Sequence, residues 1–208
     1  MSLPLVLFGV PFSSTLNPAS LGATNWWATR KTYISQGNGT LILPDNIGSL
    51  NLSSNTVAKT PTIQSGLNNI NKLVFDGISN CLQTSTTTLT QPVFLISVIK
   101  ILSGNTGTPA IFDGFNSTNM LFDLSPNLTT FRMFAGDTLN APNNVTDSLV
   151  IFSHFYSGSA SKLWINGVLQ STTGNTASNI PNGFTVGARG SNTNFSKIEY
   201  YETILFRN

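Results

Sequence analysis

Short apolar runs, separated by clusters of turn-forming residues, follow one another along the whole chain. The runs that read as strands lie at 3–9, 40–43, 72–75, 92–102, 109–112, 119–124, 129–135 and 148–156. No stretch sustains the 3.6-residue apolar period of an amphipathic helix. The pattern therefore predicts an all-β protein of about a dozen strands, arranged as antiparallel sheets in a sandwich or barrel.

One hairpin is predicted with particular clarity at residues 162–170, KLWINGVLQ. Two short apolar runs lie on either side of Asn166 and Gly167. This pair tolerates positive φ at both central positions of a type I′ turn, and the twist of that turn matches the twist of paired strands. The segment is therefore predicted to be a β-hairpin with a two-residue loop.

The apolar pattern also predicts which strands lie deepest. Residues 92–102 and 148–156 are apolar on both faces for most of their length, as in central strands that are covered on both sides. Residues 184–188 and 197–206 mix polar with apolar positions. We expect these two segments to lie nearer a solvent-exposed face.

Composition limits the chain to one folded domain. Its 208 residues are enough for a full core, and no linker-like segment divides them. Asn, Ser and Thr make up 74 residues, which favours turns, while 14 Phe, 4 Tyr and 3 Trp argue against disorder. We expect an apolar arm or lead-in strand at 1–20, retained because it lacks the basic start of a signal peptide, and the sandwich domain at 21–208.

Charge and single reactive residues exclude several functions. The net charge is only +2 and the basic residues are scattered, so no stripe for nucleic acid follows the chain. No apolar run is long enough to predict insertion into a membrane. The single cysteine, Cys81, reads as a small buried residue. The single histidine, His154, alternates with Val150, Phe152 and Tyr156 and reads as a core residue rather than a base.

The order of the motifs resembles a known family, the concanavalin A-like lectin/glucanase domains of the laminin G-like type. The matching segments are LNPASLGATNWWATR (16–30), TPTIQSGLNNINKLVFDGISNCLQT (60–84), QPVFLISVIKIL (91–102), KLWINGV (162–168), FTVG (184–187) and ETILF (202–206). This resemblance covers roughly residues 16 to 208 and implies a jelly-roll sandwich of two large antiparallel sheets. The family often has Asp-Ala after its Trp, but Ala28 and Thr29 stand here, so a ligand role of that Asp does not transfer.

The sequence offers little for catalysis. Glycosidases use two carboxylates that face each other across the bond, and the chain has only Glu199 and Glu202 besides its aspartates. An offset of three residues is expected to put these two on opposite faces of a strand, which argues against a hydrolase. A structural calcium ion stays an alternative, because its oxygen ligands are at hand in four aspartates of the chain. These are Asp113, Asp123, Asp137 and Asp147.

Sugar binding is the chemistry that the remaining residues favour. Exposed aromatic rings beside amide side chains are the expected components of such a site. Trp26 is a candidate ring, since adjacent tryptophans in a strand point to opposite faces. Two amide-rich loops supply the other candidates, which are Phe115, Asn116, Asn119, Asn192 and Asn194. The same residue types also form ordinary turns, so a purely structural role for both loops stays open.

The resemblance and the missing catalytic set together lead to a functional hypothesis. Domains of this type occur on bacteriophage and other virion surfaces, which are made in a reducing cytosol where disulfides are rare. We therefore expect a non-enzymatic virion surface protein, either a head decoration or a fibre component, with host glycans as ligands. Its partners are expected to be other virion proteins or sister subunits in a homo-oligomer. The alternatives are a free or cell-surface carbohydrate-binding module and, as a minor one, a glycoside hydrolase.

Overall fold

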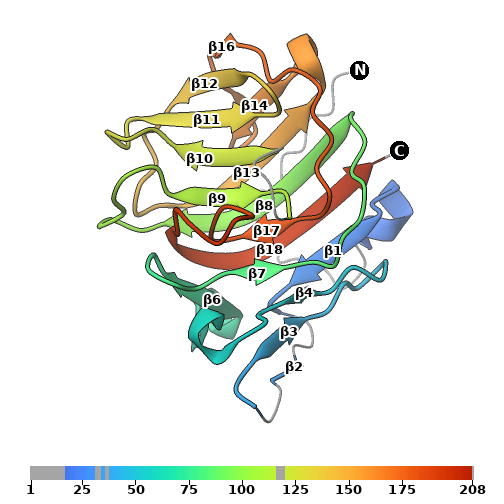
Figure 1. The fold of residues 1–208 in the computed structure, drawn as a ribbon, viewed down its shortest axis with the longest axis vertical. Coiled ribbons are helices and arrows are strands. Elements are labelled where there is room, and N and C mark those ends of the chain that lie inside the picture. Colours follow the sequence, from blue (N-terminus) through green and yellow to red (C-terminus); the bar gives the residue numbers. More distant parts are fainter. Residues whose placement is uncertain (1–16, 31–33, 36–37, 116–119, 208) are drawn as a thin grey trace.

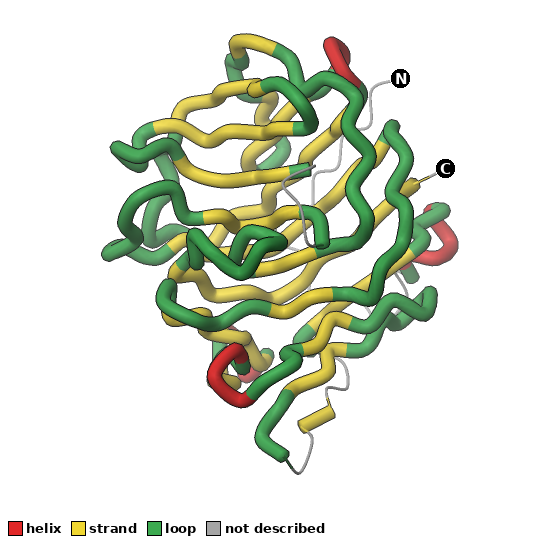
Figure 2. The backbone as a smooth tube through the Cα atoms, viewed as in Figure 1, coloured by secondary structure: helices red, strands yellow, loops and turns green. Residues whose placement is uncertain are grey.

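The computed structural model describes residues 17–30, 34–35, 38–115 and 120–207 (Figure 1). Over these residues the chain forms two antiparallel β-sheets stacked face to face, so the predicted two-sheet jelly-roll sandwich of the concanavalin A type is confirmed. Strands and loops make up nearly the whole trace, with four short 3₁₀ turns between them (Figure 2). These turns are η1 (Pro18–Leu21), η2 (Val57–Lys59), η3 (Leu67–Asn69) and η4 (Gly158–Ala160).

The eight-stranded sheet has the order β15-β14-β13-β8-β18-β6-β5, and β1 pairs with β18 beside this path. Its strands are β1 (Asn25–Ala28), β5 (Thr62–Ser65), β6 (Asn71–Asp76), β8 (Val93–Ile101), β13 (Leu149–Tyr156), β14 (Lys162–Ile165), β15 (Val168–Leu169) and β18 (Lys197–Arg207). The two runs predicted to be central, β8 and β13, pair along their whole length. Their central place in the sheet is confirmed, but the expected cover on both faces is not, since buried residues alternate with half-buried ones along both strands.

The ten-stranded sheet has the order β16-β12-β11-β10-β9-β17-β7-β4-β3-β2. Its strands are β2 (Ile34–Ser35), β3 (Leu41–Leu43), β4 (Leu52–Ser53), β7 (Leu82–Gln83), β9 (Ala110–Asp113), β10 (Leu121–Leu124), β11 (Thr130–Phe134), β12 (Thr138–Pro142), β16 (Thr173–Gly174) and β17 (Thr185–Val186). Several of these strands have only two residues, too short for an apolar pattern to show. This explains why the described residues hold more strands than the dozen predicted.

Aromatic rings from both sheets fill the space between them. Phe122 of β10 lies 5.3 Å from Phe131 and 5.3 Å from Phe152 of the opposite sheet, measured between ring centroids. Trp27 stacks on Phe184 at 5.5 Å. Each fully buried ring of this kind contributes about 1.5–3 kcal/mol. The aromatic content of the sequence is therefore used mainly to hold the sheets together.

The predicted hairpin is confirmed in detail. Asn166 and Gly167 have φ of 51° and 79°, and the strands β14 and β15 pair directly across them. His154 lies fully buried with its ring centroid 4.1 Å from that of Phe122, which confirms it as a core residue. Cys81 is buried as predicted, and burial raises the pKa of its thiol to about 11.

Two segments lie deeper than predicted. We expected 184–188 and 197–206 nearer a solvent-exposed face, but β17 is buried within the ten-stranded sheet and β18 is central in the other. The chain after β17 covers the outer face of β17, as described below. The acidic residues of β18 are tolerated there because each is paired with a cation. Polar residues in a strand are thus masked here by partners that lie far away in the sequence.

Part of the predicted arm lies outside the described residues. Of the segment 1–20 the structure describes only 17–20, where Asn17 caps η1 by accepting a hydrogen bond from the Ala19 backbone N–H at 3.1 Å. The arm-and-sandwich division of the chain thus stays a prediction. Among the described residues, no helix is long and apolar enough to cross a bilayer.

Candidate functional site

The outer face of the ten-stranded sheet carries a cluster of buried polar side chains. Successive residues of a strand point to opposite faces. Phe122 and Leu124 of β10 point into the core, so Asp123 between them points outward. The same alternation on β11 places Phe131 and Met133 inside and Arg132 outside.

The chain after β17 crosses this outer face and is anchored to it. The Gly190 N–H donates to Oδ2 of Asp113 at 3.0 Å, and the Gly190 carbonyl accepts from Nε2 of Gln83 at 3.2 Å. Gln83 also donates to Oγ1 of Thr185 at 3.2 Å. Asp113 and Gln83 extend from β9 and β7, on either side of β17. The crossing segment is therefore fixed over β17, and Arg189, the residue before Gly190, reaches across the sheet to Asp123 of β10.

A tight turn at Gly187 starts the crossing. Gly187 has φ of +86°, and a Cβ built on it would lie 2.3 Å from Cδ1 of Phe75. Only glycine fits both the left-handed backbone and this close approach. The Gly187 N–H donates to the Ile111 carbonyl at 2.9 Å, which ties the turn to β9.

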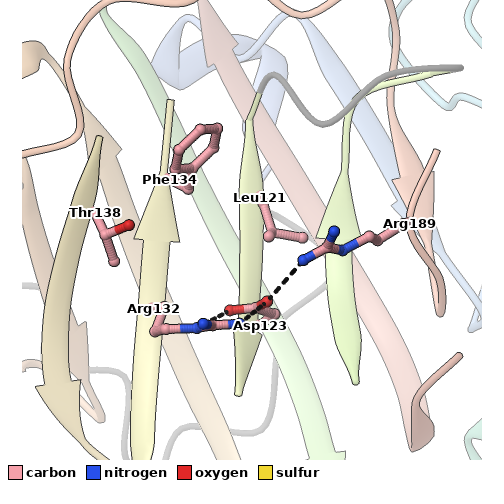
Figure 3. A pocket seen from close by; sticks show the side chains of 6 residues that line it. All are labelled: Leu121, Asp123, Arg132, Phe134, Thr138 and Arg189. Carbon is pink, nitrogen blue, oxygen red and sulfur yellow. Dashed lines mark hydrogen bonds and ion pairs between the residues drawn. The ribbon is translucent and has the colours of Figure 1, made fainter. Parts of the chain in front are cut away.

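Three charged side chains, from β10, β11 and the crossing segment, meet at one point (Figure 3). Arg132 donates from Nε to Oδ1 of Asp123 at 2.8 Å and from Nη2 to Oδ2 at 2.5 Å, a two-point ion pair. Arg189, which precedes Gly190, approaches from the other side with its Nη2 3.8 Å from Oδ2. The Asp123 side chain is 0% exposed, whereas those of Arg132 and Arg189 are 26% and 30% exposed.

The electrostatics of the cluster follow from this burial. Burial raises the pKa of Asp123, and the hydrogen bonds and charge of Arg132, together with the nearby charge of Arg189, oppose the rise. Burial likewise raises the pKa of Asp113 to about 7, against the hydrogen bonds from the Gly190 and Gly114 N–H groups and the charge of Arg189. Asp123 thus forms a close ion pair with Arg132. Asp113, the second carboxyl group near Arg189, is only partly ionised at neutral pH.

The cluster lines a shallow cavity of about 240 Å³. The lining residues are Leu121, Asp123, Arg132, Phe134, Thr138 and Arg189, and Figure 3 shows Phe134 and Thr138 farther along the neighbouring strands. Sites for drug-sized ligands usually have about 300–1,000 Å³. The cavity therefore suits one ring-sized group, with guanidinium donors, a hydroxyl group and an aromatic edge within reach.

None of the described residues that the sequence predicted as sugar-binding residues lines this cavity. Asn192 accepts a hydrogen bond from Sγ of Cys81 at 3.3 Å, and Asn194 donates to the Thr108 carbonyl at 3.1 Å. Both amides thus hold the segment that follows Arg189. Phe115 is half-buried at the end of β9, where a Cβ on Gly183 would lie 2.7 Å from its own Cβ. Asn116 and Asn119 lie outside the described residues.

Trp26, the remaining candidate, lies on the eight-stranded sheet. Only 6% of the residue is exposed, its Nε1 donates to Oε1 of Glu202 at 2.5 Å, and the guanidinium carbon of Arg30 lies 5.3 Å from its ring centroid. The structure therefore does not bring Trp26 together with the two predicted loops.

The expectation that Glu199 and Glu202 point to opposite faces is wrong. A β-bulge between Tyr200 and Glu202 inserts one residue, so Glu199 pairs with Lys100 and Glu202 with Val98 on the same outer face of β8. Each carboxylate is bound to its own cation. Nζ of Lys72 lies 2.6 Å from Oε1 of Glu199. Nη2 of Arg30 lies 3.1 Å from Oε1 of Glu202.

The aspartates considered for calcium do not form a ligand set, because no three His, Cys, Asp or Glu side chains converge in the part of the chain that the structure describes. Asp137 accepts from the Thr138 N–H at 2.7 Å and Asp147 from the Ser103 N–H at 2.9 Å, so each stabilises a turn. Asp76 accepts from the Ile78, Ser79 and Asn80 N–H groups and so stabilises the turn after β6.

Comparisons with known proteins show the fold. No protein-family model matches the chain, and no curated protein sequence does. Trypanosoma rangeli sialidase in complex with 2,3-difluorosialic acid superposes with a TM-score of 0.62 at 13% identity, covering 96% of this chain and 34% of the sialidase. Domain 4 of AbnA, a GH43 extracellular arabinanase from Geobacillus stearothermophilus in complex with arabinotriose, superposes with a TM-score of 0.61 at 15% identity.

The coverage of the two matches differs. The comparison covers 89% of this chain and 92% of the arabinanase domain, so the two are similar over nearly their whole length. Against the sialidase, this chain spans only about a third of the protein's length. At these identities, both matches show a shared fold.

Proposed function

We propose that this protein is a non-enzymatic carbohydrate-binding domain, and that sugars bind in the cavity around Asp123 on the outer face of the ten-stranded sheet. The observation that carries the proposal is the two-point ion pair between Asp123 and Arg132, beside Phe134 and Thr138. A fixed guanidinium group presents donors to ring hydroxyl groups, and an aromatic edge packs against the C–H groups of a sugar.

The fold is compatible with this use. Domain 4 of AbnA, which has the same fold over nearly its full length, was solved with arabinotriose bound. Sharing a fold does not by itself transfer a ligand, so the argument rests on the side chains of the cavity. Arabinotriose is nevertheless a suitable first neutral probe.

Binding without bond cleavage is proposed because the two glutamates are engaged elsewhere. A glycosidase needs one protonated and one ionised carboxyl group on opposite sides of the bond. Glu199 and Glu202 lie on β18 of the eight-stranded sheet, away from the cavity, and each is bound to a cation there. A hydrolase would release reducing sugar from a bound oligosaccharide, and the release would fall in Glu199→Gln or Glu202→Gln. We expect no release.

A glycan array with the full chain tests the proposal, followed by titration calorimetry on the sugars that bind. Phe134→Ala is expected to weaken binding about tenfold or more, because its ring lines the cavity. Phe94→Ala is the matched control, since Phe94 is equally half-buried but lies on the outer face of the eight-stranded sheet. Sugar binding that is lost in Phe94→Ala and retained in Phe134→Ala would refute the assignment of the site.

The virion surface role, as a head decoration or fibre component, stays a prediction, as do the sister-subunit contacts and the apolar arm. Cryo-electron microscopy of purified particles tests the virion role, and absence of this protein from both the capsid and the fibre would contradict it. Light scattering of the full chain tests the second. The proposed role of the apolar arm is to dock the protein to the particle or to sister subunits, and unchanged oligomerisation and particle attachment after deletion of residues 1–15 would refute that role.

A further inference from the structure

The charges of the cavity are not balanced within close contacts. Arg132 occupies both oxygens of Asp123, so these two groups neutralise each other. Nη2 of Arg189 lies 3.8 Å from the same carboxylate, which is longer than the upper limit of about 3.2 Å for an N–H···O hydrogen bond. Its charge is therefore surplus to what the buried Asp123 requires.

Arg189 also has donors to spare. Its Nε is buried and has no hydrogen-bond partner among the described residues. A guanidinium group has five N–H donors in a planar fork that matches a carboxylate or sulfate group at two points. The buried Nε is out of a ligand's reach, but 30% of the Arg189 side chain is exposed at the cavity, so a ligand there can meet the exposed part of the group.

The backbone holds Arg189 in this position. Its N–H donates to the Thr193 carbonyl at 2.9 Å, and its carbonyl accepts from the Asn192 N–H at 2.8 Å. Gly190, directly after it, is fixed by Asp113 and Gln83. A side chain with a fixed backbone loses less entropy when it binds, which favours a specific contact.

The second carboxylate compensates Arg189 only in part. Asp113 is fully buried and uses its two oxygens to accept from the Gly114 N–H at 2.7 Å and the Gly190 N–H at 3.0 Å. These contacts are to backbone groups and not to the guanidinium group. The Arg189 guanidinium group therefore has no carboxylate within hydrogen-bond distance among the described residues.

We propose that the sugars bound here are acidic, carrying a carboxylate or sulfate group, and that Arg189 determines this specificity by binding the anionic group. The proposal rests on the proposed carbohydrate-binding function and deepens it. Arg132 and Phe134 contact the neutral part of the sugar, while Arg189 selects the charge.

Matched pairs of ligands test the proposal by calorimetry with the full chain. One pair is trigalacturonate and its carboxyl-reduced form, and the other is a sulfated lactose and lactose. A charge-assisted contact is expected to favour the acidic member by about ten- to a hundred-fold. The pair with the larger ratio identifies whether carboxylate or sulfate is preferred.

Variants separate a specificity role from a structural one. Arg189→Gln is expected to weaken binding of the acidic member about ten- to a hundred-fold more than binding of the neutral member, and Arg189→Lys is expected to restore part of the preference. Arg207→Gln on the other sheet is the matched control and should change neither affinity. If Arg189→Gln does not fold, the wild-type ratios and their decline with salt decide the question.

The outcomes for the two proposals are distinct. Equal affinity for acidic and neutral members, or a preference that survives in folded Arg189→Gln, would overturn the inference and leave the carbohydrate-binding function intact. If no sugar binds at all, including arabinotriose and those on the array, the proposed function itself fails.

Discussion

Removal of the Arg132 guanidinium group is the change whose consequence the structure defines best. In Arg132→Met, the aliphatic part of the side chain is kept and the cation is lost. Asp123, which is 0% exposed, would then keep only Arg189 at 3.8 Å. Breaking a buried ion pair from one side costs about 3–5 kcal/mol, because a buried charge is left without its partner. Since Arg132 is partly exposed and Arg189 remains, we expect about 3 kcal/mol at pH 8.

The loss is expected to depend on pH in a definite direction. Without Arg132, the pKa of Asp123 in the folded state rises further above its value in the unfolded chain, so the folded protein binds a proton more readily. Stability is then retained at low pH and lost as pH rises through the folded pKa. The destabilisation in Arg132→Met should therefore be smaller at pH 5 than at pH 8.

Urea unfolding followed by tryptophan fluorescence, at both pH values, measures the free energy of unfolding directly. Arg207→Met is the matched control, because Arg207 is half-buried and donates to the Thr88 carbonyl at 3.2 Å rather than to a carboxylate. The double variant Asp123→Leu/Arg132→Met should recover much of the loss. A loss below about 1 kcal/mol at pH 8, or one that is equal at both pH values, would show that the pair is not buried as described.

Three further predictions concern buried groups and one turn. Burial lowers the pKa of His154 from 6.5 to about 3, so the unfolded chain binds a proton below pH 6.5 that the folded protein does not, and stability falls with pH. In urea unfolding, His154→Phe should remove about 2 kcal/mol of the stability that is lost between pH 8 and pH 5. The pH dependence that Asp113 contributes has the opposite sign, because its pKa is raised to about 7. The stability of wild type relative to Asp113→Asn should fall by about 2–3 kcal/mol from pH 5 to pH 8. Gly187→Ala should cost about 2 kcal/mol or more in thermal unfolding, because of its left-handed backbone and the contact with Phe75. Gly107→Ala, with positive φ but open space, isolates the backbone part, and equal losses in the two glycine variants would contradict the steric argument.

The sequence predicted the fold from features that act locally. Apolar alternation marks strands such as β8 and β13, and the Asn166-Gly167 pair marks a hairpin. Two-residue strands such as β16 escape this reasoning, because pairing of the backbone rather than side-chain pattern defines them. The bulge after Tyr200 also escapes it, and with it the correct face of Glu202, since one inserted residue reverses the alternation.

The candidate site could be predicted only in part. The sequence drew attention to the segments around Phe115 and Asn192, and the second of these follows Arg189, but neither Phe115 nor Asn192 lines the cavity. The pairing of Asp123 with Arg132 could have been found, since the two residues face each other across the hairpin of β10 and β11. Arg189 could not, because it reaches Asp123 only through the crossing of the chain over β17, a long-range contact that no local pattern encodes.

The central claim is that acidic sugars bind at Arg189 and Arg132. It is tested most directly by NMR, by following the Nε–Hε signals of the arginine side chains during titration with trigalacturonate and with arabinotriose. The account predicts that the signals of Arg189 and Arg132 shift on saturable binding of trigalacturonate, with Arg189 less affected by the neutral sugar, while those of Arg30 and Arg207 on the other sheet stay in place. Saturable shifts confined to Arg30 or Arg207 would place the ligand on the other sheet and contradict the account.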